Sequence, residues 1–126
     1  MQLLARQHRR PMRLRIAANN YALSLLKVMR FEETRALLRK SMPVARRVLG
    51  EGNDLTLRMK RTYAEARYLD PGATLDDIRE AVTTLEDTDR IARRVFGGAH
   101  PLVMDIEDSL EESRAALRAR ETPGPV

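Results

Sequence analysis

Paired carboxylates are the first candidates for catalysis in this chain, because two acidic side chains aimed at one substrate can act as a general acid and a general base. Three pairs occupy neighbouring positions: Glu32-Glu33, Asp76-Asp77 and Glu111-Glu112. Consecutive side chains on a helix diverge by about 100°, so adjacency alone does not direct both at one substrate. The pairs are better explained as charges at helix starts and on exposed faces. We therefore expect no catalytic residues and no enzyme.

Histidine and cysteine, the usual residues of nucleophilic and metal sites, are scarce. The 126 residues include two histidines, His8 and His100, and no cysteine. His100 stands at an expected helix start and is better explained as a turn residue than as a base. Asp70-Pro71-Gly72 lacks the alternating acids of a calcium loop, and no glycine-rich phosphate loop or metal-ligand spacing occurs. We expect no cofactor and no metal, and the lack of cysteine fits an intracellular, cytoplasmic protein.

The uneven distribution of charge along the chain indicates what kind of partner it could bind. The net charge is +5, but residues 1–67 hold 16 basic and 5 acidic residues, whereas residues 68–126 hold 7 and 13. Opposite charge on the two halves favours self-association, as a homo-oligomer or as part of a larger assembly. The first 31 residues contain no acid. Such an Arg-rich start is also typical of organelle targeting, and that alternative stays open.

The basic half also allows binding to nucleic acid or another polyanion, which would be salt-dependent. The basic residues concerned are Arg9, Arg10, Arg13, Arg15, Arg46, Arg47, Arg58, Lys60 and Arg61. Aromatic residues make up only 4% of the chain, however, and platforms that stack single-stranded bases need them. No helix-turn-helix or zinc-finger pattern occurs. A basic helical subunit of a larger particle is therefore the second hypothesis.

Helices are expected to position these charges. Hydrophobic residues make up 43% of the chain and charged residues 33%, with few of the β-branched and aromatic residues that strands prefer. This composition predicts an all-α protein. No apolar run approaches the roughly 18–20 residues that span a bilayer, so no membrane partner is expected. Apolar spacing of 3.6 residues predicts five helices, over residues 12–28, 31–49, 54–69, 74–96 and 101–120.

Residues between these segments predict how the helices begin and end. Gly50 fits the left-handed position that follows a helix, and Pro43 predicts a kink inside the second helix. Asn53 or Asp54 is expected to cap the third helix, and Thr74 with Asp77 forms a near capping box for the fourth. Pro101 suits the first position of the fifth helix. Residues 1–11 are expected to form a basic segment, and residues 121–126 a flexible tail.

One six-residue segment of the chain occurs twice in nearly the same form. Residues 45–50 (Ala-Arg-Arg-Val-Leu-Gly) return 47 positions later as residues 92–97 (Ala-Arg-Arg-Val-Phe-Gly). Repeats of about 20–50 residues indicate arrays in which each unit buries its apolar face on the next and leaves a surface for partners. Binding is therefore the first functional hypothesis.

Several motifs resemble the tetratricopeptide family, and most closely its long-repeat type in kinesin light chains. Asn19-Asn20-Tyr21-Ala22 is followed by Arg30-Phe31-Glu32-Glu33 and Gly50, with Met29 and Thr34 replacing the usual turn glycine and alanine. Tyr63-Ala64 repeats the first motif after 42 residues, and residues 97–101 (Gly-Gly-Ala-His-Pro) match the start of a third unit. The resemblance implies a right-handed solenoid of antiparallel helical hairpins, with units over residues 12–52, 53–99 and 100–120. Ala22 and Ala64 are the small residues expected where the helices of a hairpin approach closely.

The resemblance also implies where a partner binds. In this family the first helices of successive repeats line a concave groove that holds an extended peptide. By register, the partner-binding residues would be Asn19, Lys27, Arg58, Arg61, Glu65, Tyr68, Asp105, Asp108 and Glu112. The amide of Asn19 could hold a peptide backbone, and Arg58 and Arg61 could bind a carboxylate. The alternative is that these residues are only the solvated faces of amphipathic helices.

Overall fold

The computed structural model describes the backbone of residues 2–122 and the side chains of residues 15–122, and this part of the chain is all-helical. The all-α class is therefore confirmed, with five helices and no strand in the described backbone. The helices are α1 (Gln2–Lys27), α2 (Phe31–Leu49), α3 (Asp54–Tyr68), α4 (Leu75–Phe96) and α5 (Pro101–Glu121).

The first helix begins ten residues earlier than expected. We predicted a start at Met12, after a separate basic segment. The helix instead runs from Gln2 through Pro11, along a stretch rich in the helix-favouring residues leucine, arginine and glutamine. At the other end α5 includes Glu121, and residues 123–126 of the expected tail lie outside the described residues.

The predicted helix starts are confirmed by their capping hydrogen bonds. The Asn53 side chain, rather than that of Asp54, accepts from the Leu55 amide at 2.9 Å. At α4, Thr74 Oγ1 accepts from the Asp77 amide at 3.1 Å, and the Asp77 carboxylate accepts from the Thr74 amide at 2.9 Å. This is a complete capping box. Pro43 lies inside α2.

His100 is the N-cap residue of α5. Its ring Nδ1 accepts from the Leu102 amide at 3.1 Å, directly before Pro101 at the start of α5. The ring also stacks on Phe96, with the two centroids 4.6 Å apart. The interpretation of His100 as a turn residue is therefore confirmed.

The sequence repeat is also a structural repeat. Ala45 and Ala92 are fully buried, whereas Val48 and Val95 are about half exposed. Gly50 and Gly97 adopt nearly the same backbone angles, φ 95° and ψ 161° against φ 84° and ψ 156°. Positive φ was expected at Gly50, but this ψ is extended rather than left-handed helical, a region that only glycine occupies readily.

Replacing Gly97 with alanine is expected to lower the free energy of unfolding by about 1–3 kcal/mol, because a Cβ strains this backbone. The neighbouring Gly98 does not have a positive φ and provides the matched control. A Cβ there meets only the flexible end of Arg93 at 3.3 Å. Urea unfolding of both variants, followed by circular dichroism, checks the difference. Equal stabilities would contradict the backbone argument.

The helices form two hydrophobic clusters that share α3. Each helix packs on the next one along the chain, and α3 also contacts both α1 and α5. The first cluster joins α1, α2 and α3 around Ala22, Leu38 and Met59. The second joins α3, α4 and α5 around Leu85 and Ile106. Central α3 therefore buries residues on most of its circumference, from Thr56 to Tyr68.

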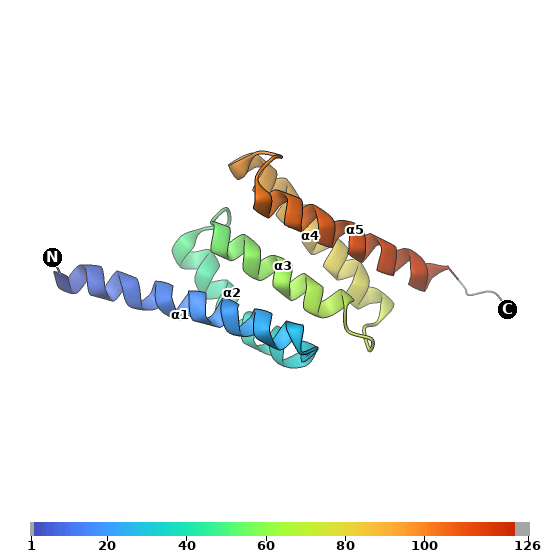
Figure 1. Ribbon diagram of the computed structural model, residues 1–126, viewed down its shortest axis with the longest axis horizontal. Coiled ribbons are helices and arrows are strands. Elements are labelled where there is room, and N and C mark those ends of the chain that lie inside the picture. Colours follow the sequence, from blue (N-terminus) through green and yellow to red (C-terminus); the bar gives the residue numbers. More distant parts are fainter. Residues whose placement is uncertain (1, 123–126) are drawn as a thin grey trace.

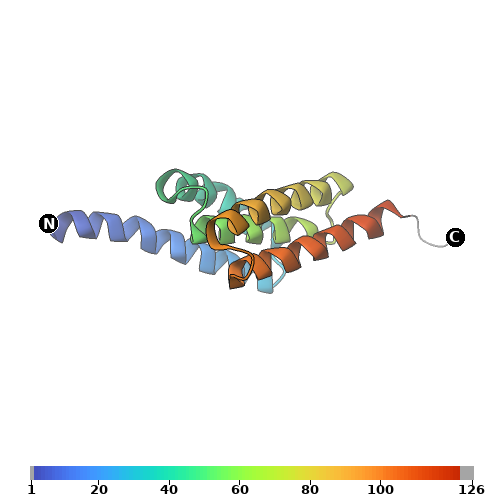
Figure 2. The same cartoon turned by 90° about the horizontal axis from the view of Figure 1, so that it is seen from above.

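The arrangement places the even-numbered helices apart from α1 and α5. In Figure 2, α2 and α4 lie along one side of the molecule and α1 and α5 along the other, while α3 runs between them. The N-terminal part of α1 extends beyond the remaining helices in both views (Figures 1 and 2).

The two small residues of the expected close approaches, Ala22 and Ala64, are both fully buried. The apolar spacing that predicts the helices also includes Tyr21, Val48 and Val95, but these side chains are 57%, 53% and 50% exposed. Tyr21 lies on the outer side of α1, which no other helix of the described chain covers, and Val48 lies in the last turn of α2.

Candidate partner-binding site

The nine predicted partner-binding residues lie on the three odd-numbered helices. Asn19 and Lys27 belong to α1, residues 58–68 to α3, and residues 105–112 to α5. Because α3 contacts α1 on one side and α5 on the other, the three helices lie next to one another. We call the surface along α1, α3 and α5 the odd-helix face.

Four of the predicted residues meet in one polar network between α3 and α5. Arg61 forms an ion pair with Glu65 at 3.0 Å, and its Nε donates to Ser109 Oγ at 2.8 Å. Ser109 Oγ in turn donates to Glu65 Oε1 at 2.8 Å. One helical turn further, the Tyr68 hydroxyl donates to Glu112 at 2.8 Å. Side chains more than 40 positions apart are thereby fixed against one another.

Burial shifts the pKa values of two residues in this network. Burial raises the pKa of Glu65 above its ordinary value, although the charge of Arg61 and the hydrogen bond from Ser109 oppose the shift. The nearby carboxylates of Glu112 and Asp105 add to it. Burial and the hydrogen bond to Glu112 also raise the pKa of the Tyr68 hydroxyl. The centre of the network is therefore a poorly solvated place for negative charge.

Replacing Glu65 with glutamine is expected to stabilise the protein increasingly as the pH rises. A carboxyl whose folded pKa is raised stabilises fully below its unfolded pKa of about 4.5 and loses that contribution as the pH passes the folded pKa. The glutamine variant and the wild type should be similar near pH 4, and the variant more stable near pH 7. Urea unfolding of both proteins from pH 4 to pH 7 measures how the difference in their stability changes.

The exposed Asp108→Asn variant is the control and should show no such widening gap. A Glu65→Gln protein less stable than wild type at pH 7 would show that the ion pair with Arg61 outweighs burial.

The other predicted residues take no part in this network. Arg58 is exposed and pairs with Asp54 on its own helix, and Lys27 and Asp108 are also exposed. Asp105 is half-buried. Asn19 is only 5% exposed, and its Oδ1 has no hydrogen-bond partner among the described residues. Arg58 on α3 and Asp108 on α5 are therefore open to solvent, whereas Tyr68, only 6% exposed, and Asn19 are nearly buried.

Sequence reasoning missed Ser109, which links Arg61 to Glu65. A lone serine four residues after Asp105 carries no chemical signal. Only its helical register with residues 105 and 112, on the same side of α5, could have indicated it.

Sequence reasoning also missed a groove on the opposite side of α3. A cavity of about 570 Å³ lies between α2 and α4, with α3 as its floor. Its wall residues include Arg46 from α2, Lys60 and Tyr63 from α3, and Glu80 and Asp87 from α4. Lys60 is itself paired with Glu51 at 2.6 Å.

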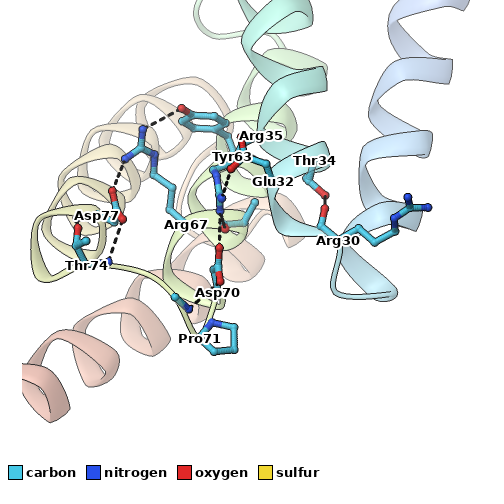
Figure 3. Close-up of polar contacts among 12 residues, drawn as sticks. Arg30, Glu32, Thr34, Arg35, Tyr63, Arg67, Asp70, Pro71, Thr74 and Asp77 are labelled. Carbon is cyan, nitrogen blue, oxygen red and sulfur yellow. Dashed lines mark hydrogen bonds and ion pairs between the residues drawn. The ribbon is translucent and has the colours of Figure 1, made fainter.

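Beside this groove, arginines tie α2, α3 and the turn before α4 together (Figure 3). Arg67 pairs with Asp77 at 3.2 Å and with Glu80 at 2.9 Å, and it donates to the Tyr63 hydroxyl at 3.1 Å. Burial alone would raise the pKa of Tyr63, but hydrogen bonds from Arg67 and Arg39 outweigh it and lower the pKa. Since each link is made within the chain, this cluster holds helices together.

The described residues form neither a metal site nor a membrane-spanning helix. No group of three or more acidic or histidine side chains there is placed to hold a metal ion. None of the helices described combines the length and apolar character that crossing a bilayer needs. A scan against protein-family models matches no family, and searches of curated proteins and of solved structures find no significant match.

Proposed function

We propose that this protein is a protein–protein interaction module that binds a peptide or protein partner on its odd-helix face. The observation that carries the proposal is the contact of Arg61, Glu65, Tyr68 and Glu112 across α3 and α5. Residues chosen by repeat register alone lie on neighbouring helices and contact one another, which supports the proposal. We further propose that the helices form a tetratricopeptide-like array, similar to that of kinesin light chains.

Three features support the array. Short turns join consecutive helices, and each helix packs on its neighbour, as in a row of hairpins. The odd-numbered helices also pack on one another through α3. Gly50 and Gly97 end two helices with the same backbone conformation, 47 residues apart. A solenoid forms when the same helical hairpin repeats and each unit ends in the same reversal of the chain.

The charges on the odd-helix face indicate what kind of partner fits. Lys27 and Arg58 supply positive charge at the α1 and α3 part of the face, while Asp105 and Asp108 supply negative charge on α5. A partner with acidic residues followed by basic residues would match this order.

The test is an affinity pulldown with the wild type beside an Arg58→Glu/Arg61→Glu variant, both treated with nuclease. The matched control is Arg47→Glu/Arg94→Glu, which makes the same charge change at two exposed positions of α2 and α4. Circular dichroism must show all three folded. Because Arg61 is partly buried and paired, Arg58→Glu alone serves as a milder variant.

We expect a small set of proteins to bind the wild type and the control but to be lost from the Arg58→Glu/Arg61→Glu variant. Equal binding to all three proteins would exclude the odd-helix face. Loss of binding on nuclease treatment alone would favour the second candidate, a polyanion-binding subunit. That candidate rests on the excess of basic residues in positions 1–67.

A further inference from the structure

We propose that the acidic side of α5 on the odd-helix face binds the basic N-terminal part of α1 from a second copy of this chain. The inference rests on the proposed function, since it names an occupant for one part of the same face. The donor is a helical segment that extends past the rest of its own chain. The acceptor is a helix face whose three carboxylates form no ion pair with the described side chains.

The donor is the N-terminal part of α1. This helix starts at Gln2 and extends beyond the other helices (Figures 1 and 2). Arg6, Arg9, Arg10 and Arg13 are spaced i, i+3, i+4 and i+7, the spacing of a single helical face. Residues 1–31 contain no acid that could neutralise them locally. An isolated helical segment is marginal in water, so binding elsewhere would stabilise it.

The acceptor is an acidic stripe formed by Asp105, Asp108 and Glu112 of α5, at i, i+3 and i+7. Asp108 and Glu112 are exposed, and none of the three has a cationic partner among the described side chains. Arginines on or near α5 pair with other carboxylates: Arg61 with Glu65, Arg93 with Glu107, and Arg114 with Glu86 and Glu111.

The two stripes match in length as well as in sign. A helix rises 1.5 Å per residue, so residues 6–13 and residues 105–112 each extend over about 10 Å. Two helices packed side by side would therefore place arginines opposite carboxylates along the whole length of both stripes. Planar guanidinium groups suit such paired contacts with carboxylates.

The contact must be made between two molecules. Within one chain, α1 contacts α2 and α3 but not α5. Since α1 is a single helix from Gln2 to Lys27, its N-terminal part cannot fold back onto the α5 of the same chain. A second copy supplies the same basic stripe without any change of fold.

The first test is the mass of the full chain by light scattering at 50 and 500 mM NaCl. We expect a mass well above the 14.4 kDa of one chain at low salt and a monomer at high salt. The Debye length falls from more than about 10 Å at 50 mM salt to less than about 10 Å at 500 mM, so exposed charge pairs are largely screened at the higher salt. A monomer at both salt concentrations would overturn the inference.

Charge reversal locates the contact. Reversing the acidic stripe (Asp105→Lys, Asp108→Lys, Glu112→Lys) should give a monomer at low salt, and so should reversing the basic stripe (Arg6→Glu, Arg9→Glu, Arg10→Glu, Arg13→Glu). Mixing the two variants should restore association, which general misfolding could not do. A control with the same charge change on α4 (Asp76→Lys, Glu86→Lys, Asp87→Lys) should still associate. Association by both reversed variants would contradict the proposed contact.

This outcome is separable from that of the pulldown. A salt-independent monomer that still loses its partners on mutation of Arg58 and Arg61 would leave the proposed function standing without a second copy. Association that depends on the two stripes, with equal capture by all pulldown variants, would support the second copy and exclude other partners for this face.

Discussion

Replacing Leu85 with alanine is expected to lower the free energy of unfolding by about 3–5 kcal/mol, far more than any substitution on the surface of the helices should cost. Leu85 is fully buried at the centre of the cluster that joins α3, α4 and α5. Truncation removes apolar contacts and leaves a cavity that helices held at both ends cannot close. A domain of this size is stable by only about 5–15 kcal/mol, so the loss is a large share of the total.

Urea unfolding measured by circular dichroism checks this value. Val95→Ala is the matched control on the same helix, because Val95 is half exposed and its truncation should cost within about 0.5–1 kcal/mol. Leu38→Ala, fully buried in the other cluster, should cost a similar amount to Leu85→Ala. A Leu85→Ala protein as stable as Val95→Ala would contradict the packing described for α4.

Most of the fold could be predicted because local signals agreed with one another. Glycine, proline and capping residues lie at nearly every helix end, and Asn53, Thr74 and Pro101 act as predicted. The predicted start of the first helix was wrong, since no local signal says whether a helix continues before residue 12. The expected burial of Tyr21 was wrong for a different reason. Periodicity identifies an apolar side of a helix but not whether another helix covers it.

The candidate site was predicted only in part. Repeat register placed residues on α3 and α5 that do meet, because side chains at i, i+3 and i+4 share a face in any regular helix. Register could not show that Asn19 is nearly buried or that Ser109 links Arg61 to Glu65. Both facts depend on how close α3 lies to its neighbours, a tertiary property. The groove between α2 and α4 was missed for the same reason.

Replacing Arg35 with methionine is expected to lower the free energy of unfolding by about 2–3 kcal/mol. Arg35 of α2 donates to the Ala66 carbonyl at 2.6 Å and to Asp70 at 3.1 Å, and it pairs with Glu32 at 2.7 Å (Figure 3). Its side chain is only 14% exposed, so its loss leaves a carbonyl and a half-buried carboxylate without this donor. Methionine retains most of the apolar stem, and the missing hydrogen bonds should therefore account for the loss.

The matched control is Lys40→Met, an exposed basic residue on the same helix, which should change stability by less than about 0.5 kcal/mol. Arg35→Lys should recover less than half of the loss, since an ammonium cannot make the forked contact to Ala66 and Asp70. Equal unfolding midpoints for Arg35→Met and Lys40→Met would show that the contacts of Arg35 do not stabilise the fold. Because Arg35 fixes the α1–α2 hairpin to the end of α3, its loss should also loosen the alignment of α1 with α3. The partner binding proposed for the odd-helix face should then weaken, even though no residue of that face has changed.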